Sequence, residues 1–210
     1  GSSPHILGQN EPDNTGDPRE VVTKIEDLLA VWPELMATGK RLGSPAMSGN
    51  LNMLYQFLDS IDARGWRCDF VTVHSYWYSD WGSWLWNFNN IHNRTGRPLW
   101  ITEMNYGANW TGWPAGNDRS GSASNLAIEK QHMAPILDGL ESTGYVERYA
   151  FYNHVQDCRA AYLNGSLTPI GEYYANLESG LAYNSAHAYV PRLPASKGAP
   201  RDLEVKFNSQ

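Results

Sequence analysis

Short apolar runs alternate with longer segments of helical periodicity along most of this 210-residue chain. The runs of strand length are residues 5–10, 40–46, 70–74, 98–103 and 149–154. Between them, apolar residues recur three or four positions apart at residues 21–36, 51–61, 84–92 and 126–140, and a last helix begins near residue 167. Strands that alternate with helices predict a parallel β-sheet covered by helices, which is the α/β class.

Two of the predicted strands, one in each half of the chain, end in a glutamate. The first run leads into Glu11, and the fourth leads into Glu103. The carboxyl ends of parallel strands are where α/β folds build their sites, and two carboxylates at that edge suit the acid–base and nucleophilic chemistry of glycoside hydrolysis. The alternative is that both are solvated loop glutamates.

The composition limits the kinds of partner that this protein is expected to bind. A net charge of −6 argues against nucleic acid or an anionic membrane surface as partner. The chain has 9 Trp and 12 Tyr, and this surplus fits either an aromatic interior or a surface that stacks on flat sugar faces. No stretch reaches the roughly 20 apolar residues of a membrane helix, so we expect no membrane insertion.

The cysteines predict no metal site. Cys68 and Cys158 are the only two, and neither lies in a Cys/His ligand spacing. We expect buried free thiols, with a mutual disulfide as the alternative. No metal is expected, and no other cofactor is expected either, since glycoside hydrolysis by two glutamates requires none.

Two segments depart from the alternation. Residues 105–124 form a long loop rich in Gly, Asn and Trp, and a loop of that length is typical of a functional segment. Beyond residue 184 the chain becomes rich in Pro, Ser and Gly, so residues 185–210 are expected to be a linker and the possible start of a β-rich accessory module. Residues 1–184 are then one domain.

Four motifs stand in order on successive predicted strands. They are Leu7-Gly8-Gln9-Asn10-Glu11-Pro12-Asp13, Ser44-Pro45-Ala46, Val73-His74-Ser75-Tyr76 and Pro98-Leu99-Trp100-Ile101-Thr102-Glu103. Asn-Glu-Pro at one strand end and Thr-Glu at a later one resemble the retaining glycosidases that carry their glutamates on strands four and seven of a barrel. More narrowly, the chain resembles glycoside hydrolase family 128, whose members cleave β-1,3-glucan.

The resemblance implies a (β/α)8 TIM barrel in which this chain supplies strands four to eight, while strands one to three are absent from the sequence. Residues 1–184 would then be the C-terminal part of the catalytic domain, with a companion N-terminal fragment as a possible partner. The chain has no start methionine and no signal-peptide pattern, so we expect a mature or cut chain. An enzyme of this kind is expected to be secreted, whether extracellular, at the cell surface or periplasmic.

The resemblance also implies residue roles. Glu11 corresponds to the acid/base and Glu103 to the nucleophile of a double displacement. Asn10 would hydrogen-bond the sugar 2-hydroxyl, or alternatively cap the turn before Pro12. Tyr76 would hold Glu103, and His74 would line the sugar site or else pack as a structural histidine.

Aromatic side chains past strand ends are expected to line the sugar subsites. The predicted substrate-binding residues are Asn10, His74, Tyr76, Trp77, Trp110, Trp113, Tyr106 and Tyr152. Trp84, Trp86 and Trp100 are better explained as packing residues.

The expected function is therefore a retaining endo-β-1,3-glucanase with a β-glucan as its substrate. The same two glutamates could cleave a β-1,4-glucan, mannan or galactan instead. A catalytically inactive carbohydrate-binding fragment, or a structural fragment whose partner carries the activity, is the alternative from another class.

Overall fold

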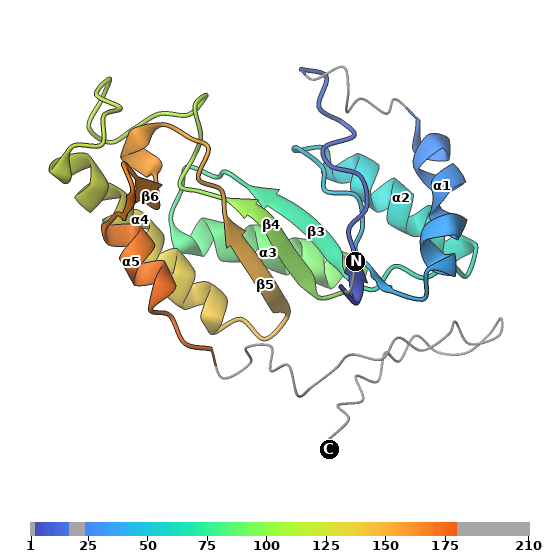
Figure 1. Ribbon diagram of the computed structural model, residues 1–210. Helices are drawn as coiled ribbons and strands as arrows, with labels where there is room; N and C mark the ends of the chain where they lie inside the picture. The colour runs from blue at the N-terminus through green and yellow to red at the C-terminus, as the bar shows by residue number, and fades with distance from the viewer. Residues whose placement is uncertain (1–2, 17–23, 180–210) are drawn as a thin grey trace. The chain divides into compact units, whose positions relative to one another are not determined.

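Strands and helices alternate from residue 5 to residue 151 in the computed structural model, which describes residues 3–16 and 24–179 (Figure 1). This part contains β1 (His5–Ile6), α1 (Ile25–Ala37), β2 (Arg41–Leu42), α2 (Leu51–Ala63), β3 (Val71–Ser75), α3 (Trp81–Thr95), β4 (Leu99–Met104), α4 (Ala123–Glu141) and β5 (Val146–Phe151). A 3₁₀ turn η1 (Asp157–Arg159), the hairpin strands β6 (Tyr162–Leu163) and β7 (Ser166–Leu167), and α5 (Pro169–Ala175) follow. The order confirms the predicted α/β class.

Some predicted segments lie outside the described residues. These are the start of the first helix at residue 21 and the whole linker with its accessory module at residues 185–210. Within the described part, no helix is both long and apolar enough to cross a membrane.

The chain divides into two compact units, and the division runs across β3 and β4. Among the described residues, the first unit comprises 3–16, 24–73 and 95–100, and the second comprises 74–94 and 101–179. Each unit therefore has its own strand pairs and its own core.

The strand pairs of the first unit are parallel. β1 pairs with β2, and a bridge between Asn10 and Ala46 carries this pairing to the residue before Glu11. A further parallel bridge joins Met47 to Val73. Glu11 therefore follows the carboxyl end of a parallel strand, as predicted.

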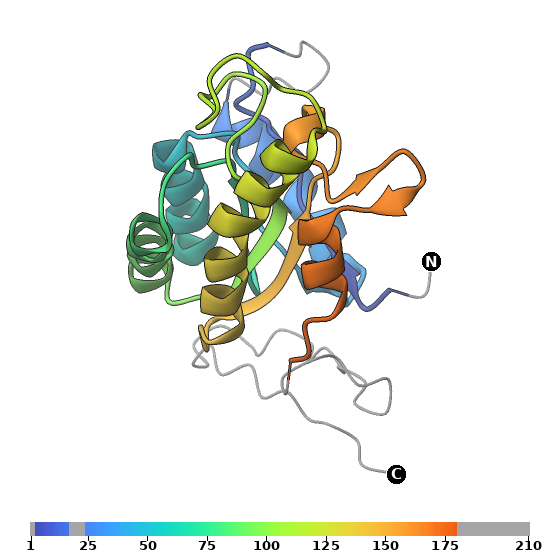
Figure 2. The same ribbon diagram turned by 90° about the vertical axis from the view of Figure 1, so that its left-hand side faces the viewer.

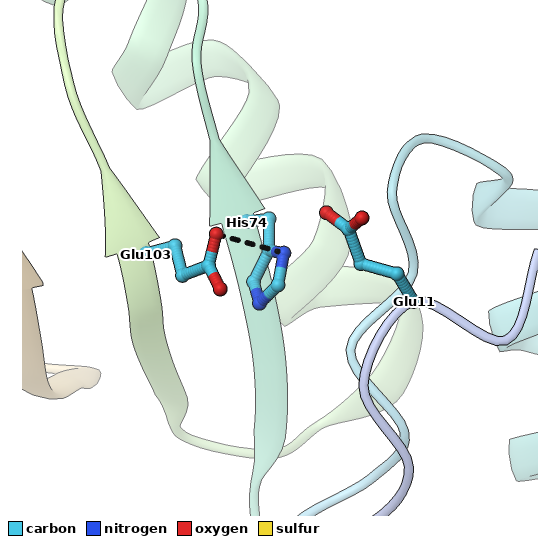
Figure 3. A group of neighbouring side chains, drawn as sticks. All are labelled: Glu11, His74 and Glu103. Carbon is cyan, nitrogen blue, oxygen red and sulfur yellow. Dashed lines mark ion pairs between the residues drawn. The ribbon is translucent and has the colours of Figure 1, made fainter. Parts of the chain in front are cut away.

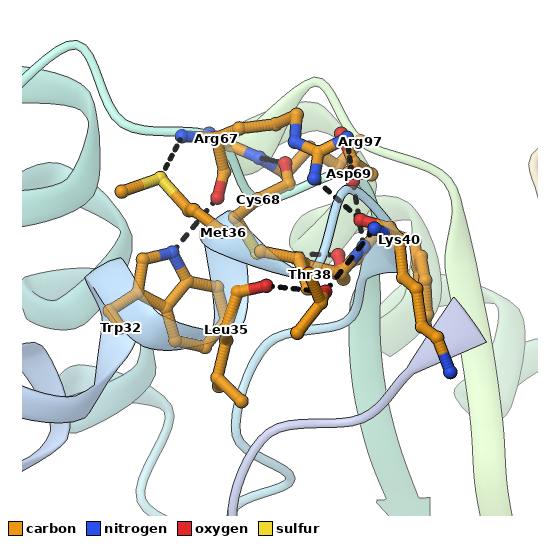
Figure 4. A network of polar contacts seen from close by, with 11 residues as sticks. Trp32, Leu35, Met36, Thr38, Lys40, Arg67, Cys68, Asp69 and Arg97 are labelled. Atoms are coloured by element: carbon orange, nitrogen blue, oxygen red, sulfur yellow. Dashed lines mark hydrogen bonds and ion pairs between the residues drawn. The ribbon is translucent and has the colours of Figure 1, made fainter. Parts of the chain in front are cut away.

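A network of polar contacts joins the loops that lead into β2, β3 and β4 (Figure 4). The indole N–H of Trp32 donates to the carbonyl of Arg67 at 2.9 Å, and Arg97 Nε donates to the carbonyl of Cys68 at 2.8 Å. Cys68 and Cys158 are both buried and free, which confirms the predicted free thiols. Burial raises the pKa of the Cys68 thiol to about 12. This end of the strands thus holds the first unit together, while Glu11 follows the opposite end.

The three-stranded sheet has the order β3-β4-β5. The N–H of Asn105 donates to the carbonyl of Ser75 at 3.2 Å, and the N–H of Tyr152 donates to the carbonyl of Met104 at 3.0 Å. Because each bond joins residues at the ends of neighbouring strands, the carboxyl ends of all three strands lie at one edge. Residues that follow these strands are therefore brought together.

Helices α4 and α5 pack against each other in the second unit, and a glycine in each helix also allows a close contact with another segment (Figure 2). Gly139 of α4 faces the Trp81 ring so closely that a Cβ there would come within 2.1 Å of it. Gly171 of α5 lies against Ala161 in the same way, with 1.9 Å between an added Cβ and the Ala161 oxygen. Both contacts require glycine, because any side chain would separate the packed segments.

Two local predictions need correction. The last strand was expected at residues 149–154 but occupies 146–151, three residues earlier. The β6–β7 hairpin was not predicted, although its turn at Asn164-Gly165 has the positive φ values, 51° and 84°, that favour Asn and Gly in a two-residue hairpin loop.

Candidate active site

Glu103 lies at the carboxyl end of β4, and the His74 side chain of β3 lies beside its carboxylate (Figure 3). The hydroxyl of Tyr76 donates to Oε2 of Glu103 at 2.6 Å. Nδ1 of His74 lies 3.6 Å from the same oxygen, a distance of ion-pair contact when the imidazole is protonated. The His74 side chain is 2% exposed and that of Glu103 is 24% exposed, so the carboxylate remains accessible to a ligand.

The spacing of His74 and Tyr76 explains why both reach Glu103. In an extended chain, residues two apart point to the same face. His74 is still within β3, while Tyr76 follows its last residue, Ser75. The predicted role of Tyr76 as the residue that holds Glu103 fits this geometry.

Two aromatic rings lie beside Tyr76. The ring of Trp110 lies edge-on at 5.6 Å between centroids, and that of Tyr152 lies edge-on at 5.9 Å. Trp110 is 77% exposed. Its apolar face is thus accessible beside the tyrosine that contacts Glu103, and an accessible indole face can stack on a sugar ring.

Three other predicted substrate-binding side chains pack inside the second unit. Trp113 is buried and donates its indole N–H to Asn125 at 2.9 Å. Tyr106 is buried and stacks on His132 with 4.3 Å between ring centroids. Trp77 packs against the aromatic side chains of α3. Their described contacts are those of packing residues.

Burial sets the protonation of the Tyr106–His132 stack. It raises the pKa of Tyr106 and lowers the pKa of His132. Both rings are therefore neutral near pH 7, and the stack needs no counter-charge.

The tryptophans predicted to pack behave differently from one another. Trp84 is 0% exposed and Trp100 is 8% exposed, which confirms their packing role. Trp86 is 66% exposed, so the prediction that it packs is wrong. Trp84 and Trp86 are two positions apart and point to different sides of α3, so the two side chains cannot both face the core.

Glu11 belongs to the first unit and has an unusual backbone conformation. Its φ of 38° is rare for a residue other than glycine and is found where surrounding contacts hold the chain in place. Its N–H donates to the carbonyl of Ala46 at 2.7 Å, and the side-chain amide of Asn14 donates to its Oε2 at 2.8 Å. Asn10, the predicted ligand of the sugar 2-hydroxyl, is exposed.

Asp13 fixes the turn that carries Glu11. Its carboxylate accepts the backbone N–H groups of Ser48 at 2.7 Å, Gly49 at 3.2 Å and Asn50 at 2.8 Å. Charge-assisted bonds of this kind are stronger than bonds between neutral groups. Asp13 stands in the first of the four motifs, but its role in holding the turn was not predicted.

A buried contact between Asn105 and Arg159 is a second feature that was not predicted. Asn105 is fully buried, and its amide donates to the carbonyls of Tyr152 at 3.0 Å and Arg159 at 3.1 Å. Arg159 is fully buried as well. No motif in the sequence marks Arg159, because all its partners but Gln156 and Cys158 are distant in sequence.

Glu103 lies at a strand end of an α/β fold, where a hydroxyl and an imidazole contact its carboxylate beside an exposed indole. This arrangement suits a carbohydrate-cleaving site. The sequence matches the glycosyl hydrolase catalytic core family over residues 1–174. The chain therefore belongs to this family and is a glycoside hydrolase, as its motifs predicted.

Solved structures of glycoside hydrolase family 128 are similar to this chain. An endo-β-1,3-glucanase from Amycolatopsis mediterranei, crystallised as a glutamate-to-glutamine variant with laminarihexaose, is 26% identical, with a TM-score of 0.68 over 82% of this chain and 72% of that one. An exo-β-1,3-glucanase from Cryptococcus neoformans is 23% identical, with a TM-score of 0.65 over 81% and 68%. An oligosaccharide-binding protein from Trichoderma gamsii is 24% identical, with a TM-score of 0.65 over 84% and 68%. No curated protein sequence matches the chain.

Proposed function

We propose that this chain hydrolyses β-1,3-glucan, as an endo-acting and retaining enzyme, with Glu103 as nucleophile and Glu11 as acid/base. The observation that carries the proposal is the Glu103 carboxylate, which accepts the Tyr76 hydroxyl at 2.6 Å at the end of a strand in a glycosyl hydrolase catalytic core. The substrate is inferred from the similar Amycolatopsis enzyme, an endo-β-1,3-glucanase solved with laminarihexaose.

The chemistry follows from two carboxylates in different protonation states. Glu11 donates a proton to the glycosidic oxygen as its bond to the anomeric carbon breaks, and Glu103 attacks that carbon to form a glycosyl ester. Glu11 then takes a proton from water, the water attacks the same carbon, and Glu103 leaves as a carboxylate. The inverted configuration of the first step is inverted again in the second, so the product retains the β-configuration.

The neighbouring residues serve binding and orientation in this proposal. The Tyr76 hydroxyl fixes the rotamer of the Glu103 carboxylate, and His74 lines the sugar site beside it. Trp110 and Tyr152 offer apolar faces to glucose rings, and the Asn10 amide donates to the sugar 2-hydroxyl.

We also propose that β1 to β5 correspond to strands four to eight of a (β/α)8 barrel. The parallel strand pairs within each unit and the similarity to complete family 128 enzymes support this correspondence. Strands one to three would then come from a preceding segment or a companion polypeptide. Because a polymeric glucan does not cross a membrane, the enzyme would act outside the cell.

Hydrolysis of laminarihexaose tests the proposal. We expect the protein to release shorter oligosaccharides whose new reducing ends are first β, as followed by NMR of the anomeric protons. Glu103→Gln and Glu11→Gln should each lower kcat by about 10³-fold or more, since each removes a group that acts in the chemical step. The control is Glu26→Gln, which changes an exposed glutamate on α1 and should leave kcat unchanged.

Other results would replace the proposal. Reducing ends that are first α would show inversion and exclude a glycosyl ester. Binding of laminarihexaose without cleavage would make the chain an oligosaccharide-binding protein. Faster cleavage of a β-1,4-glucan, mannan or galactan in parallel assays would change the substrate and keep the mechanism.

A further inference from the structure

The segment between β4 and α4, residues 105–122, contains no helix or strand and carries Trp110. The exposed Trp110 ring lies 5.6 Å from that of Tyr76, whose hydroxyl donates to Glu103. An irregular segment that must be ordered by its ligand lowers affinity, because the ordering costs free energy on binding. What holds this segment in the free protein therefore bears on sugar binding.

Arg159, the last residue of η1, contacts this segment on both sides of Trp110. Its Nε donates to the carbonyl of Tyr106 at 2.7 Å. Its Nη2 donates to the hydroxyl of Thr111 at 3.1 Å and to the carbonyl of Gly112. The two ends of a short stretch, residues 106–112, are thus bound to one rigid side chain.

The shape of the guanidinium is what permits these contacts. Its central carbon lies 4.8 Å from the centre of the Trp113 ring, and Nη1 donates to Gln156 at 2.5 Å. A planar group with five N–H donors can make such forked contacts and stack at the same time, whereas a lysine ammonium has no plane and no fork. Burial lowers the pKa of Arg159, and the nearby Cys158 and Glu129 act in the opposite direction.

We propose that Arg159 is a positioning residue for glucan binding, which fixes residues 106–113 and so holds Trp110 beside Tyr76. The ligand in this inference rests on the proposed function. The effect of Arg159 on the loop is independent of the proposed function, because it follows from contacts within the protein.

Two measurements on Arg159→Lys test the inference. The first is hydrogen–deuterium exchange of residues 106–113, where we expect amide exchange at least about tenfold faster than in the native sequence. The second is the Kd for laminarihexaose by calorimetry, in a Glu103→Gln background that prevents cleavage, where we expect binding about tenfold weaker.

Trp110→Ala should weaken binding at least as much. Arg159→Lys with Trp110→Ala should bind no more weakly than Trp110→Ala alone, since Arg159 acts through Trp110.

Arg119→Lys is the matched control. Arg119 also donates a hydrogen bond to residues 106–113, but this is one long bond of 3.5 Å to the carbonyl of Thr111. Its substitution should leave both the exchange rates and the Kd unchanged. A loss of affinity in this variant equal to that of Arg159→Lys would contradict the specific role of Arg159.

The remaining outcomes are distinguishable. Unchanged exchange of residues 106–113 in Arg159→Lys, or additive losses in the double variant, would overturn the inference. If the protein with native Arg159 does not bind laminarihexaose, the proposed function and the glucan part of this inference are wrong, while exchange still decides the effect on the loop. If Arg159→Lys does not fold, Thr111→Val removes one acceptor of Nη2, and equal exchange in that variant and the native sequence would count against the inference.

Discussion

The Tyr76 hydroxyl donates to the Glu103 carboxylate over 2.6 Å. Hydrogen bonds to charged groups contribute about 1.5–3 kcal/mol. If this bond is needed to orient the carboxylate in the transition state, its loss lowers the rate by a factor of about 10–100. We therefore expect Tyr76→Phe to lower kcat/KM for laminarihexaose by about 10–100-fold, with an unchanged circular dichroism spectrum.

Tyr145→Phe is the control for this prediction. The Tyr145 hydroxyl donates to Asn89 over the same 2.6 Å but touches no residue of the proposed site. Its substitution should leave kcat/KM unchanged. Full activity in Tyr76→Phe would show that Glu103 does not depend on the hydroxyl for its orientation.

The residues near Glu103 differ in how well the sequence predicted them. Glu103 could be found because it ends a short apolar run, whereas His74 and Tyr76 were found through the family motif that they share. Arg159 could not be found, since the partners that bury it are brought together only by the folding of the long loop. Trp113 was expected at the surface for a related reason. The sequence does not show that the buried Arg159 side chain covers this indole.

Helix α4 buries a carboxyl group that no proposed chemistry uses. Glu129 is fully buried, and burial raises its pKa well above the ordinary value, although Arg159 and the Tyr106 backbone lower it in part. In the unfolded chain the group ionises near pH 4.3. Since the folded state binds the proton more tightly, this group lowers the stability progressively as pH rises from about 4.3 toward its folded pKa.

Glu129→Gln should remove this pH dependence. We expect its thermal midpoint to exceed that of the native sequence at pH 8 by about 2–4 °C, the shift that about 1 kcal/mol makes in a chain of this size. At pH 4, where the native carboxyl is mostly protonated in both states, the two midpoints should lie closer together. Scanning calorimetry at both pH values is the measurement, with Glu172→Gln on the exposed side of α5 as control. A lower midpoint at pH 8 would mean that the ionised carboxylate stabilises the fold.

The helices and strands were predicted best where they are long and periodic. β4 and α2 begin or end within about two residues of their predicted bounds. β5 was placed too late because its first half is polar, with Glu147 and Arg148 exposed, while its apolar residues lie toward its end. The β6–β7 hairpin was missed because each of its strands has two residues, too few to show a period.

The proposed barrel correspondence predicts strands beyond those of the described three-stranded sheet. β5 is the last strand in the described three-stranded sheet, and three of its residues are exposed, whereas all residues of β3 are buried. Family 128 enzymes of known structure extend further, since this chain covers 72% of the Amycolatopsis glucanase. A (β/α)8 barrel requires about 250 residues and eight strands to enclose its interior.

If the barrel correspondence holds, the active species is larger than the 23.6 kDa chain. Native mass spectrometry of active fractions should then find about 80–120 further residues, the length of three more strand–helix units, on this polypeptide or on a companion. This chain alone should cleave laminarihexaose at least about 100-fold more slowly than that species, because a barrel that lacks strands leaves its sugar site incomplete. Glu103→Gln in that species should abolish cleavage, which would assign the activity to this part of the enzyme. A monomer of 23.6 kDa with the full activity would contradict the barrel correspondence and leave the glutamate chemistry intact.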